Sequence, residues 1–134
     1  MESSIQPGSR ARLLVIEDAD DTREMLKFLL EIEGYVVDTA PDGYVGLAVA
    51  RERPPAAAVI DIGLPGVDGW SVATTLRREF GNRIRLIAYT SWGRAEDRAR
   101  SAAAGFDAHL VKPIGVADVL RTISSLLLPG IAGA

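Results

Sequence analysis

Short apolar runs alternate with longer segments of helical periodicity along most of the chain. Each run is rich in Val, Ile, Leu or Ala, and each is closed by polar or turn-forming residues. Runs of this length predict β-strands, for which we expect the ranges 13–16, 35–39, 57–60, 84–89 and 108–111. The segments between them place apolar residues at helical spacing and predict α-helices over 21–33, 43–53, 68–80, 94–104 and 116–127.

Regular alternation of strand and helix is typical of a parallel sheet with helices on both faces. The continuous apolar run at 13–16 agrees with this, because strands that are buried on both faces lack a polar side. We therefore expect an α/β fold, a doubly wound (βα)5 arrangement with a five-stranded parallel sheet. The chain has the length of one domain, which we place at 12–128 between tails at 1–11 and 129–134.

Two of the expected helices have features of their own. Asp21 and Glu24 have the spacing of a capping box, which predicts that the first helix begins at Asp21. Leu26 and Leu29 share one stripe of this helix, opposite its charged side. The helix over 94–104 has a weak apolar face, so we expect it to be a loosely held element that can move.

Composition narrows the classes of function. Nearly half of the 134 residues are apolar (48%), enough for a hydrophobic core, and the net charge of −3 argues against nucleic acid as the main partner. The absence of cysteine excludes disulfides, thiolate nucleophiles and cysteine metal sites, and the single histidine, His109, excludes a multi-histidine site in a monomer. We see no signal peptide in residues 1–10 and no apolar run near the ~20 residues of a membrane span, so we expect a cytoplasmic protein that makes no membrane contact.

Asp61 is the leading candidate for a functional residue. It follows the apolar run 57–60 and precedes a loop of turn-forming residues, so we expect it at the carboxyl end of a buried strand. A buried charge is costly unless another group pairs with it. Ligands of open α/β sheets bind at this end of the strands, and the partners of Asp61 should therefore lie there too.

Four expected strand ends carry polar groups to the same edge of the sheet: Glu17 and Asp18, Asp61, Thr90, and Lys112. Three carboxylates in close contact repel one another unless a cation neutralises them. Hard oxygen ligands, with no sulfur available, favour Mg²⁺ or a similar ion. Because an ammonium and a hydroxyl group can bind phosphate oxygens, the set indicates phosphoryl chemistry with Asp61 as an in-line nucleophile.

The order and spacing of five motifs resemble those of a known family. The motifs are Glu17-Asp18, the run from Asp61 through Leu64-Pro65 to Asp68-Gly69, Thr90-Ser91, Ala104-Gly105-Phe106-Asp107, and Lys112-Pro113. With them the chain resembles the receiver domain of bacterial response regulators, the CheY-like family, over residues 12–127. The segment 105–113 is similar above all to receivers of hybrid histidine kinases and to single-domain response regulators. The resemblance implies the strand order 2-1-3-4-5, which is that of flavodoxin and CheY.

The resemblance also implies roles for the acidic residues. Asp61 is the implied phosphorylated residue, and it would bind Mg²⁺ or Mn²⁺ together with Asp18 as a direct ligand. Glu17 would act on the metal largely through water, and Gly63 would bind it through its backbone carbonyl.

Further implied roles concern the phosphoryl group itself. Thr90 and Lys112 are the implied catalytic residues beside Asp61, because both would bind phosphoryl oxygens. Ile62 and Ser91 are the other implied phosphate-binding residues. A cis peptide bond at Pro113 would aim Lys112 into the site.

Three residues are implied in switching and in the lifetime of the phosphorylated state. Thr90 is the switch hydroxyl, and His109 stands where the family often has an aromatic switch residue. His109 is more readily interpreted as a partly buried histidine with its hydrogen bonds satisfied. Trp92 stands where the family tunes dephosphorylation, and its interpretation as a loop anchor is equally open.

These roles predict a receiver that takes a phosphoryl group from the phosphohistidine of a histidine kinase or of a histidine phosphotransfer protein. We expect a signalling domain and not an enzyme, because it would catalyse only its own phosphorylation and dephosphorylation. Its output would pass to a protein target in trans without direct DNA binding, and a phosphorylation-dependent homodimer is left open. We also expect an apolar flank of the first helix to stay partly exposed and to contact the phosphotransfer partner: Met25, Phe28 and Ile32.

Two alternatives come from other classes of function. One is a pseudo-receiver that binds proteins independently of phosphorylation. The other is a phosphatase with an aspartate nucleophile, which would need a second carboxylate just after Asp61, where Ile62 and Gly63 stand. A flavin-binding domain of the same fold is less favoured, because no phosphate-binding loop follows the first strand.

Overall fold

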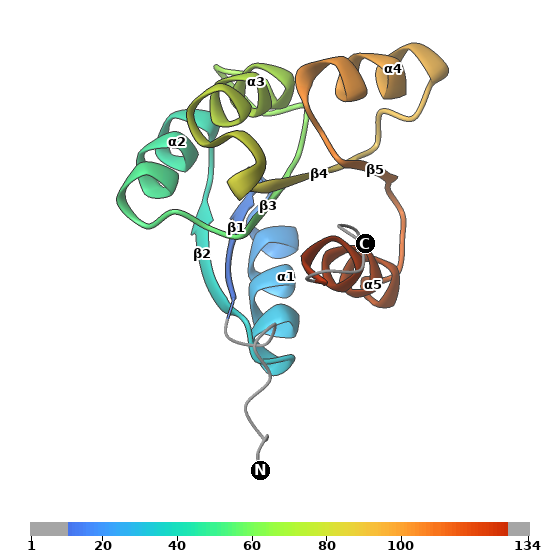
Figure 1. The fold of residues 1–134 in the computed structure, drawn as a ribbon. Coiled ribbons are helices and arrows are strands. Elements are labelled where there is room, and N and C mark those ends of the chain that lie inside the picture. The colour runs from blue at the N-terminus through green and yellow to red at the C-terminus, as the bar shows by residue number, and fades with distance from the viewer. Residues whose placement is uncertain (1–10, 129–134) are drawn as a thin grey trace.

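The computed structural model describes residues 11–128, in which strands and helices alternate along the chain (Figure 1). The elements are β1 (Arg12–Ile16), α1 (Asp20–Ile32), β2 (Val36–Ala40), α2 (Gly43–Glu52), β3 (Ala57–Ile60), α3 (Gly69–Phe80), the short 3-10 helix η2 (Gly81–Arg83), β4 (Arg85–Thr90), α4 (Ala95–Ala104), β5 (Ala108–Val111) and α5 (Val116–Leu127). β3, β5 and α5 have the predicted bounds, and the other predicted strands and helices differ by one residue at one or both ends. The predicted tails lie outside the described residues, Ala11 excepted.

The strands form one parallel sheet in the order β2-β1-β3-β4-β5, which confirms the predicted fold class and strand order. Helices α1 and α5 cover one face of the sheet, and α2, α3 and α4 cover the other (Figure 1). The strand side chains alternate between two cores. In β1, Leu13 and Val15 pack towards α1 and α5, whereas Leu14 and Ile16 pack towards α2 and α3.

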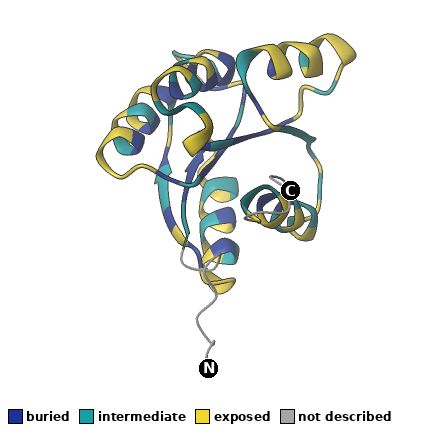
Figure 2. Ribbon diagram, viewed as in Figure 1, coloured by how far each residue is buried: buried dark blue, intermediate teal, exposed yellow. Residues whose placement is uncertain are grey.

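Burial follows this three-layer arrangement. The central strands are almost entirely buried, and the outer faces of the helices are exposed (Figure 2). β5 is only half-buried, because it is the edge strand beside β4. None of the helices between residues 11 and 128 combines the length and the apolar character needed to cross a membrane.

The start of α1 differs from the prediction. The capping box is wrong, because the N-cap is Ala19 and Asp21 lies inside the first helical turn, where its charge complements the helix dipole. The N–H group of Ala19 donates instead to the side chain of Glu17. The predicted stripe is also only partly right, since Leu26 and Leu30 are fully buried and Leu29 is half-buried.

Candidate functional site

The register of the sheet brings the predicted strand ends together. Ile16 pairs with Ile60, so Glu17 and Asp61 each stand one residue beyond that pair at the carboxyl edge of the sheet. The N–H group of Asp61 donates to the carbonyl of Ile16 at 3.0 Å, which fixes the start of the β3–α3 loop. The edge therefore presents two neighbouring carboxylates from β1 and β3.

The neighbouring strands complete this edge on the other side. Thr90 pairs with Val111 at the ends of β4 and β5, and the N–H group of Lys112 donates to the carbonyl of Thr90 at 2.8 Å. The peptide bond between Lys112 and Pro113 is cis. Lys112 thus leaves the sheet directly beside Thr90.

Glu17 is the deepest carboxylate of the site, with 2% of the residue exposed. Its side chain accepts hydrogen bonds from Lys112 Nζ at 2.8 Å and from the N–H group of Ala19 at 3.0 Å. Burial raises the pKa of the Glu17 carboxyl, because the charged form is poorly solvated, and the bond from Lys112 offsets only part of this effect. Glu17 is thus bonded directly to Lys112, and its implied water-mediated role towards a metal stays a prediction.

Lys112 connects the two inner carboxylates. Its Nζ lies 2.8 Å from Glu17 Oε1 and 3.6 Å from Asp61 Oδ2, and 5.1 Å from the centre of the Tyr89 ring. Burial acts to lower the pKa of Lys112, but the bond to Glu17 and the charge of Asp61 act more strongly together, so the pKa is raised. Lys112 is therefore a fully charged ammonium placed between two acids.

Asp61 is held with one carboxylate oxygen in a defined direction. Its Oδ1 accepts the N–H group of Gly63 at 3.1 Å, and 13% of its side chain is exposed. The loop then folds back tightly, since the N–H group of Gly69 donates to the carbonyl of Ile62 at 2.9 Å. A Cβ atom on Gly69 would lie 2.4 Å from the backbone oxygen of Asp61, so this approach requires glycine. That requirement was not foreseen from the sequence, which indicated only that Gly69 begins a helix.

The acidic residues fit a hard divalent cation. Glu17, Asp18 and Asp61 each direct one carboxylate oxygen into a common region, where these oxygens lie within 4.8 Å of one another. One ammonium cannot compensate three carboxylates, so the cluster carries excess negative charge. Such an all-oxygen set with an exposed member, Asp18, suits Mg²⁺, which keeps several of its waters.

Thr90, the last residue of β4, is buried, with 1% of the residue exposed. Its Oγ1 accepts the N–H group of Trp92 at 3.2 Å. Ser91 is exposed, and the side chain of Ile62 is fully buried, so Ile62 can contact a ligand at this edge only through its backbone. A Cβ atom on Gly63 would lie 3.4 Å from the ring of Trp92, which therefore borders the proposed metal-binding loop.

His109 makes hydrogen bonds through both ring nitrogens, as expected for a satisfied histidine. Nδ1 lies 2.8 Å from Ser101 Oγ, and Nε2 lies 2.7 Å from the carbonyl oxygen of Trp92. Ser101 Oγ also accepts from the indole nitrogen of Trp70 at 3.0 Å. The sequence contained no signal for Ser101 or Trp70, because a serine in an alanine-rich helix and a tryptophan after Gly69 are both unremarkable alone.

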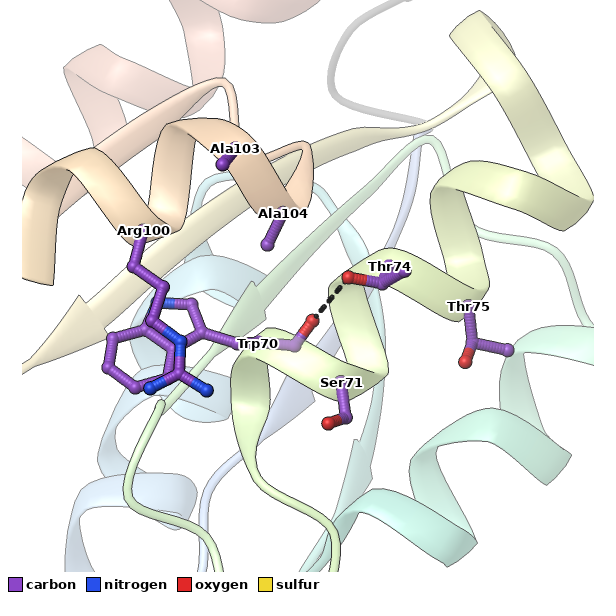
Figure 3. A pocket seen from close by; sticks show the side chains of 7 residues that line it. All are labelled: Trp70, Ser71, Thr74, Thr75, Arg100, Ala103 and Ala104. Carbon is purple, nitrogen blue, oxygen red and sulfur yellow. Dashed lines mark hydrogen bonds between the residues drawn. The ribbon is translucent and has the colours of Figure 1, made fainter.

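A concave region lies between α3 and α4 (Figure 3). It has a volume of about 440 Å³. Its lining residues are Trp70, Ser71, Thr74, Thr75, Arg100, Ala103 and Ala104. The guanidinium of Arg100 stacks over the Trp70 ring, with its central carbon 4.0 Å from the ring centre (Figure 3). None of the predicted site residues lines this groove.

Comparisons with known proteins agree with this geometry. The family model of the response regulator receiver domain matches residues 13–124. An uncharacterised 14.6 kDa protein of Leptolyngbya boryana is 32% identical over 92% of the chain and 95% of its own length. The transcriptional regulatory protein HprR of Escherichia coli is 34% identical over 87% of the chain, which spans only 51% of that regulator. A receiver domain protein (CheY-like) from Methanospirillum hungatei has a TM-score of 0.83 at 28% identity, covering 87% of the chain and 92% of its own.

Proposed function

The chain belongs to the response regulator receiver domain family of two-component systems, and we propose that it accepts a phosphoryl group on Asp61. The donor is the phosphohistidine of a histidine kinase or of a histidine phosphotransfer protein. The observation that carries this proposal is the position of Lys112, whose ammonium lies between Glu17 and Asp61 at the carboxyl edge of the sheet. This arrangement combines a nucleophile with a fixed positive charge for phosphoryl oxygens.

Receiver domains generally bind Mg²⁺, and we propose that Glu17, Asp18 and Asp61 hold Mg²⁺ or Mn²⁺ here, together with the carbonyl of Gly63. The ion, when bound, neutralises charge on the oxygens of the transferred group. The chain's own contribution is the preformed cluster, because Glu17 is bonded to Lys112 and to the Ala19 amide before any ligand arrives.

The transfer step uses the geometry of Asp61. An oxygen of its carboxylate forms a bond to phosphorus as the bond from phosphorus to the donor's imidazole nitrogen breaks, and that nitrogen takes a proton from solvent. Lys112 Nζ, 3.6 Å from Asp61 Oδ2, is close enough to bind a phosphoryl oxygen on Asp61. The Thr90 hydroxyl accepts the Trp92 amide and keeps its own proton, which it donates to another phosphoryl oxygen once Thr90 has moved towards Asp61. We propose that the domain has no other substrate and catalyses only its own phosphorylation and dephosphorylation.

A protein partner is expected at α1. Met25, Phe28 and Ile32 are exposed, and they lie three and four residues apart on one side of the helix. We propose that this flank contacts a helix of the phosphodonor protein. We propose that output then passes to a protein in trans, since the net charge of −3 does not favour attraction to DNA phosphates. HprR is a transcriptional regulatory protein, but the chain matches only half of it.

The alternatives lack a specific supporting observation. The acidic residues, Thr90 and Lys112 that an active receiver needs are all present, which disfavours a pseudo-receiver. The side chain of Ile62 is buried and Gly63 has none, so no second carboxylate follows Asp61 directly and a phosphatase is also disfavoured.

Intact mass after incubation with acetyl phosphate and Mg²⁺ tests the proposal. We expect a gain of one phosphoryl group that is lost with chelator and in Asp61→Asn. Asp21→Asn, an exposed carboxylate in the first turn of α1, is the matched control and should be phosphorylated normally. A gain that survives Asp61→Asn refutes the assignment, and binding of a partner that is indifferent to Asp61→Asn favours the pseudo-receiver.

A further inference from the structure

Helix α4 is anchored by a polar side chain. Ser101 is the one buried residue of α4, with 1% of it exposed, and the apolar contacts of this helix are limited to partly buried residues such as Ala104. Most helices of this fold are held by buried apolar side chains. The position of α4 therefore depends unusually on the hydrogen bonds of one hydroxyl.

With a neutral His109 ring, these hydrogen bonds have only one consistent set of donors and acceptors. The carbonyl of Trp92 can only accept, so His109 Nε2 must carry the proton that it donates. In the neutral ring Nδ1 is then an acceptor, and the hydroxyl of Ser101 donates to it. The indole N–H group of Trp70 donates to Ser101 Oγ and completes the chain. It connects α3, α4, β5 and the loop after β4.

This series of hydrogen bonds ends at Thr90, the implied switch residue of the phosphorylation site. Trp92 is held on both sides, because its carbonyl accepts from His109 and its N–H group donates to Thr90 Oγ1. Its ring lies beside Gly63 and 5.5 Å from the ring of Trp70. Movement of Thr90 towards Asp61 therefore strains its bond from Trp92 or, through Trp92, the bond to His109.

We propose that His109 and Ser101 are positioning residues that act through Trp92 and restrain Thr90 in the unphosphorylated arrangement. The proposal rests on phosphorylation of Asp61 as the function. In place of an aromatic switch residue, His109 here takes part in a series of hydrogen bonds. We call this series, Trp70–Ser101–His109–Trp92, the latch. Releasing the latch raises the population of the arrangement in which Thr90 is free to meet the phosphoryl group. Variants without the latch are therefore phosphorylated faster than the wild type.

The first test needs no phosphodonor. His109→Phe keeps an aromatic ring but removes both ring hydrogen bonds, and Ser101→Ala removes only the hydroxyl. We expect amide hydrogen exchange over residues 92–104 to rise about fivefold in each variant, the effect of losing one hydrogen bond. Ser125→Ala, an exposed serine on α5, is the matched control and should leave this exchange unchanged. Unchanged exchange in both latch variants overturns the proposal.

The second test measures the rate of phosphorylation by acetyl phosphate. We expect His109→Phe and Ser101→Ala to be phosphorylated about fivefold faster than the wild type, and the double variant to be no faster than the faster single variant, because both break one chain. A residue with a merely structural role would leave the rate unchanged or lower it. Equal or slower rates in both variants overturn the latch.

The outcomes separate this proposal from the proposed function. Trp70 and Trp92 are the only tryptophans of the chain and both belong to the latch, so tryptophan fluorescence should change on phosphorylation of the wild type and already be shifted in His109→Phe. A wild-type chain that gains no phosphoryl group from acetyl phosphate or from its kinase refutes the function. Exchange and fluorescence without phosphodonor still decide whether the latch holds α4.

Discussion

Gly69→Ala tests how closely α3 must approach the phosphorylation site. The new Cβ atom would lie 2.4 Å from the backbone oxygen of Asp61 and 2.6 Å from Ile62 Cα, against 3.4 Å for an ordinary contact. Both neighbours are backbone atoms, so α3 and the β3–α3 loop must separate by about 1 Å. Overpacking of this kind costs about 1–3 kcal/mol of stability. A shift of about 1 Å at a reacting group lowers its rate on the order of 100-fold.

Urea unfolding and the time course of phosphorylation by acetyl phosphate measure the two effects. We expect Gly69→Ala to lower the free energy of unfolding by about 2 kcal/mol and to slow phosphorylation of Asp61 on the order of 100-fold. Gly115→Ser is the control, because a Cβ atom there meets nothing within 4 Å and serine is a good residue at this N-cap of α5. Wild-type stability and rate in Gly69→Ala would show that the loop has room to spare and would refute the reasoning.

Three further predictions concern the metal, the fold and the partner surface. Mg²⁺ at about 100 times its Kd should raise the free energy of unfolding by about 2.7 kcal/mol, and an equal urea midpoint with Mg²⁺ and with chelator would contradict the metal site. Arg77→Met should lower the free energy of unfolding by about 2 kcal/mol, because the guanidinium donates to the carbonyls of Gly105 and Ile84 and to the Asp107 carboxylate. An unchanged urea midpoint would show that solvent replaces these bonds. Phe28→Asp, at a residue that is 62% exposed, should slow phosphotransfer from the cognate donor protein at least about tenfold and leave the rate of phosphorylation by acetyl phosphate unchanged. Tyr44→Asp on α2, at a residue that is 67% exposed, is the control, and an equal loss in this variant would place the partner elsewhere.

The order and approximate bounds of the strands and helices were predictable, because they depend on local patterns in the sequence. Continuous apolar runs such as 57–60 identify buried strands, and the spacing of apolar residues identifies the helices between them. The errors were local too. The capping box at Asp21 was wrong because the Glu17 side chain accepts the Ala19 amide, so the helix begins earlier without a side-chain cap of its own.

The identity of the site residues was also accessible from the sequence, since parallel strands end at one edge and the polar residues follow those ends. Which of these side chains bond to one another could not be predicted from the sequence. Lys112 bonds most closely to Glu17, 95 residues away, and only secondarily to Asp61, because the depth of each side chain depends on how β1, β3 and β5 pack together. Glu17 is consequently the most deeply buried acid of the site, which sequence position alone does not reveal.

The sequence by itself determined the α/β fold and the residues that stand at its carboxyl edge, because hydrophobic periodicity and strand ends are properties of short segments. Only the tertiary structure decided which of these side chains touch. The bond from Trp70 to Ser101 spans 31 residues and the bond from Ser101 to His109 joins a helix to a strand, so both exist only when α3, α4 and β5 are packed. Hydrogen bonds require distances correct to a few tenths of an ångström, and that precision comes from packing and not from sequence pattern.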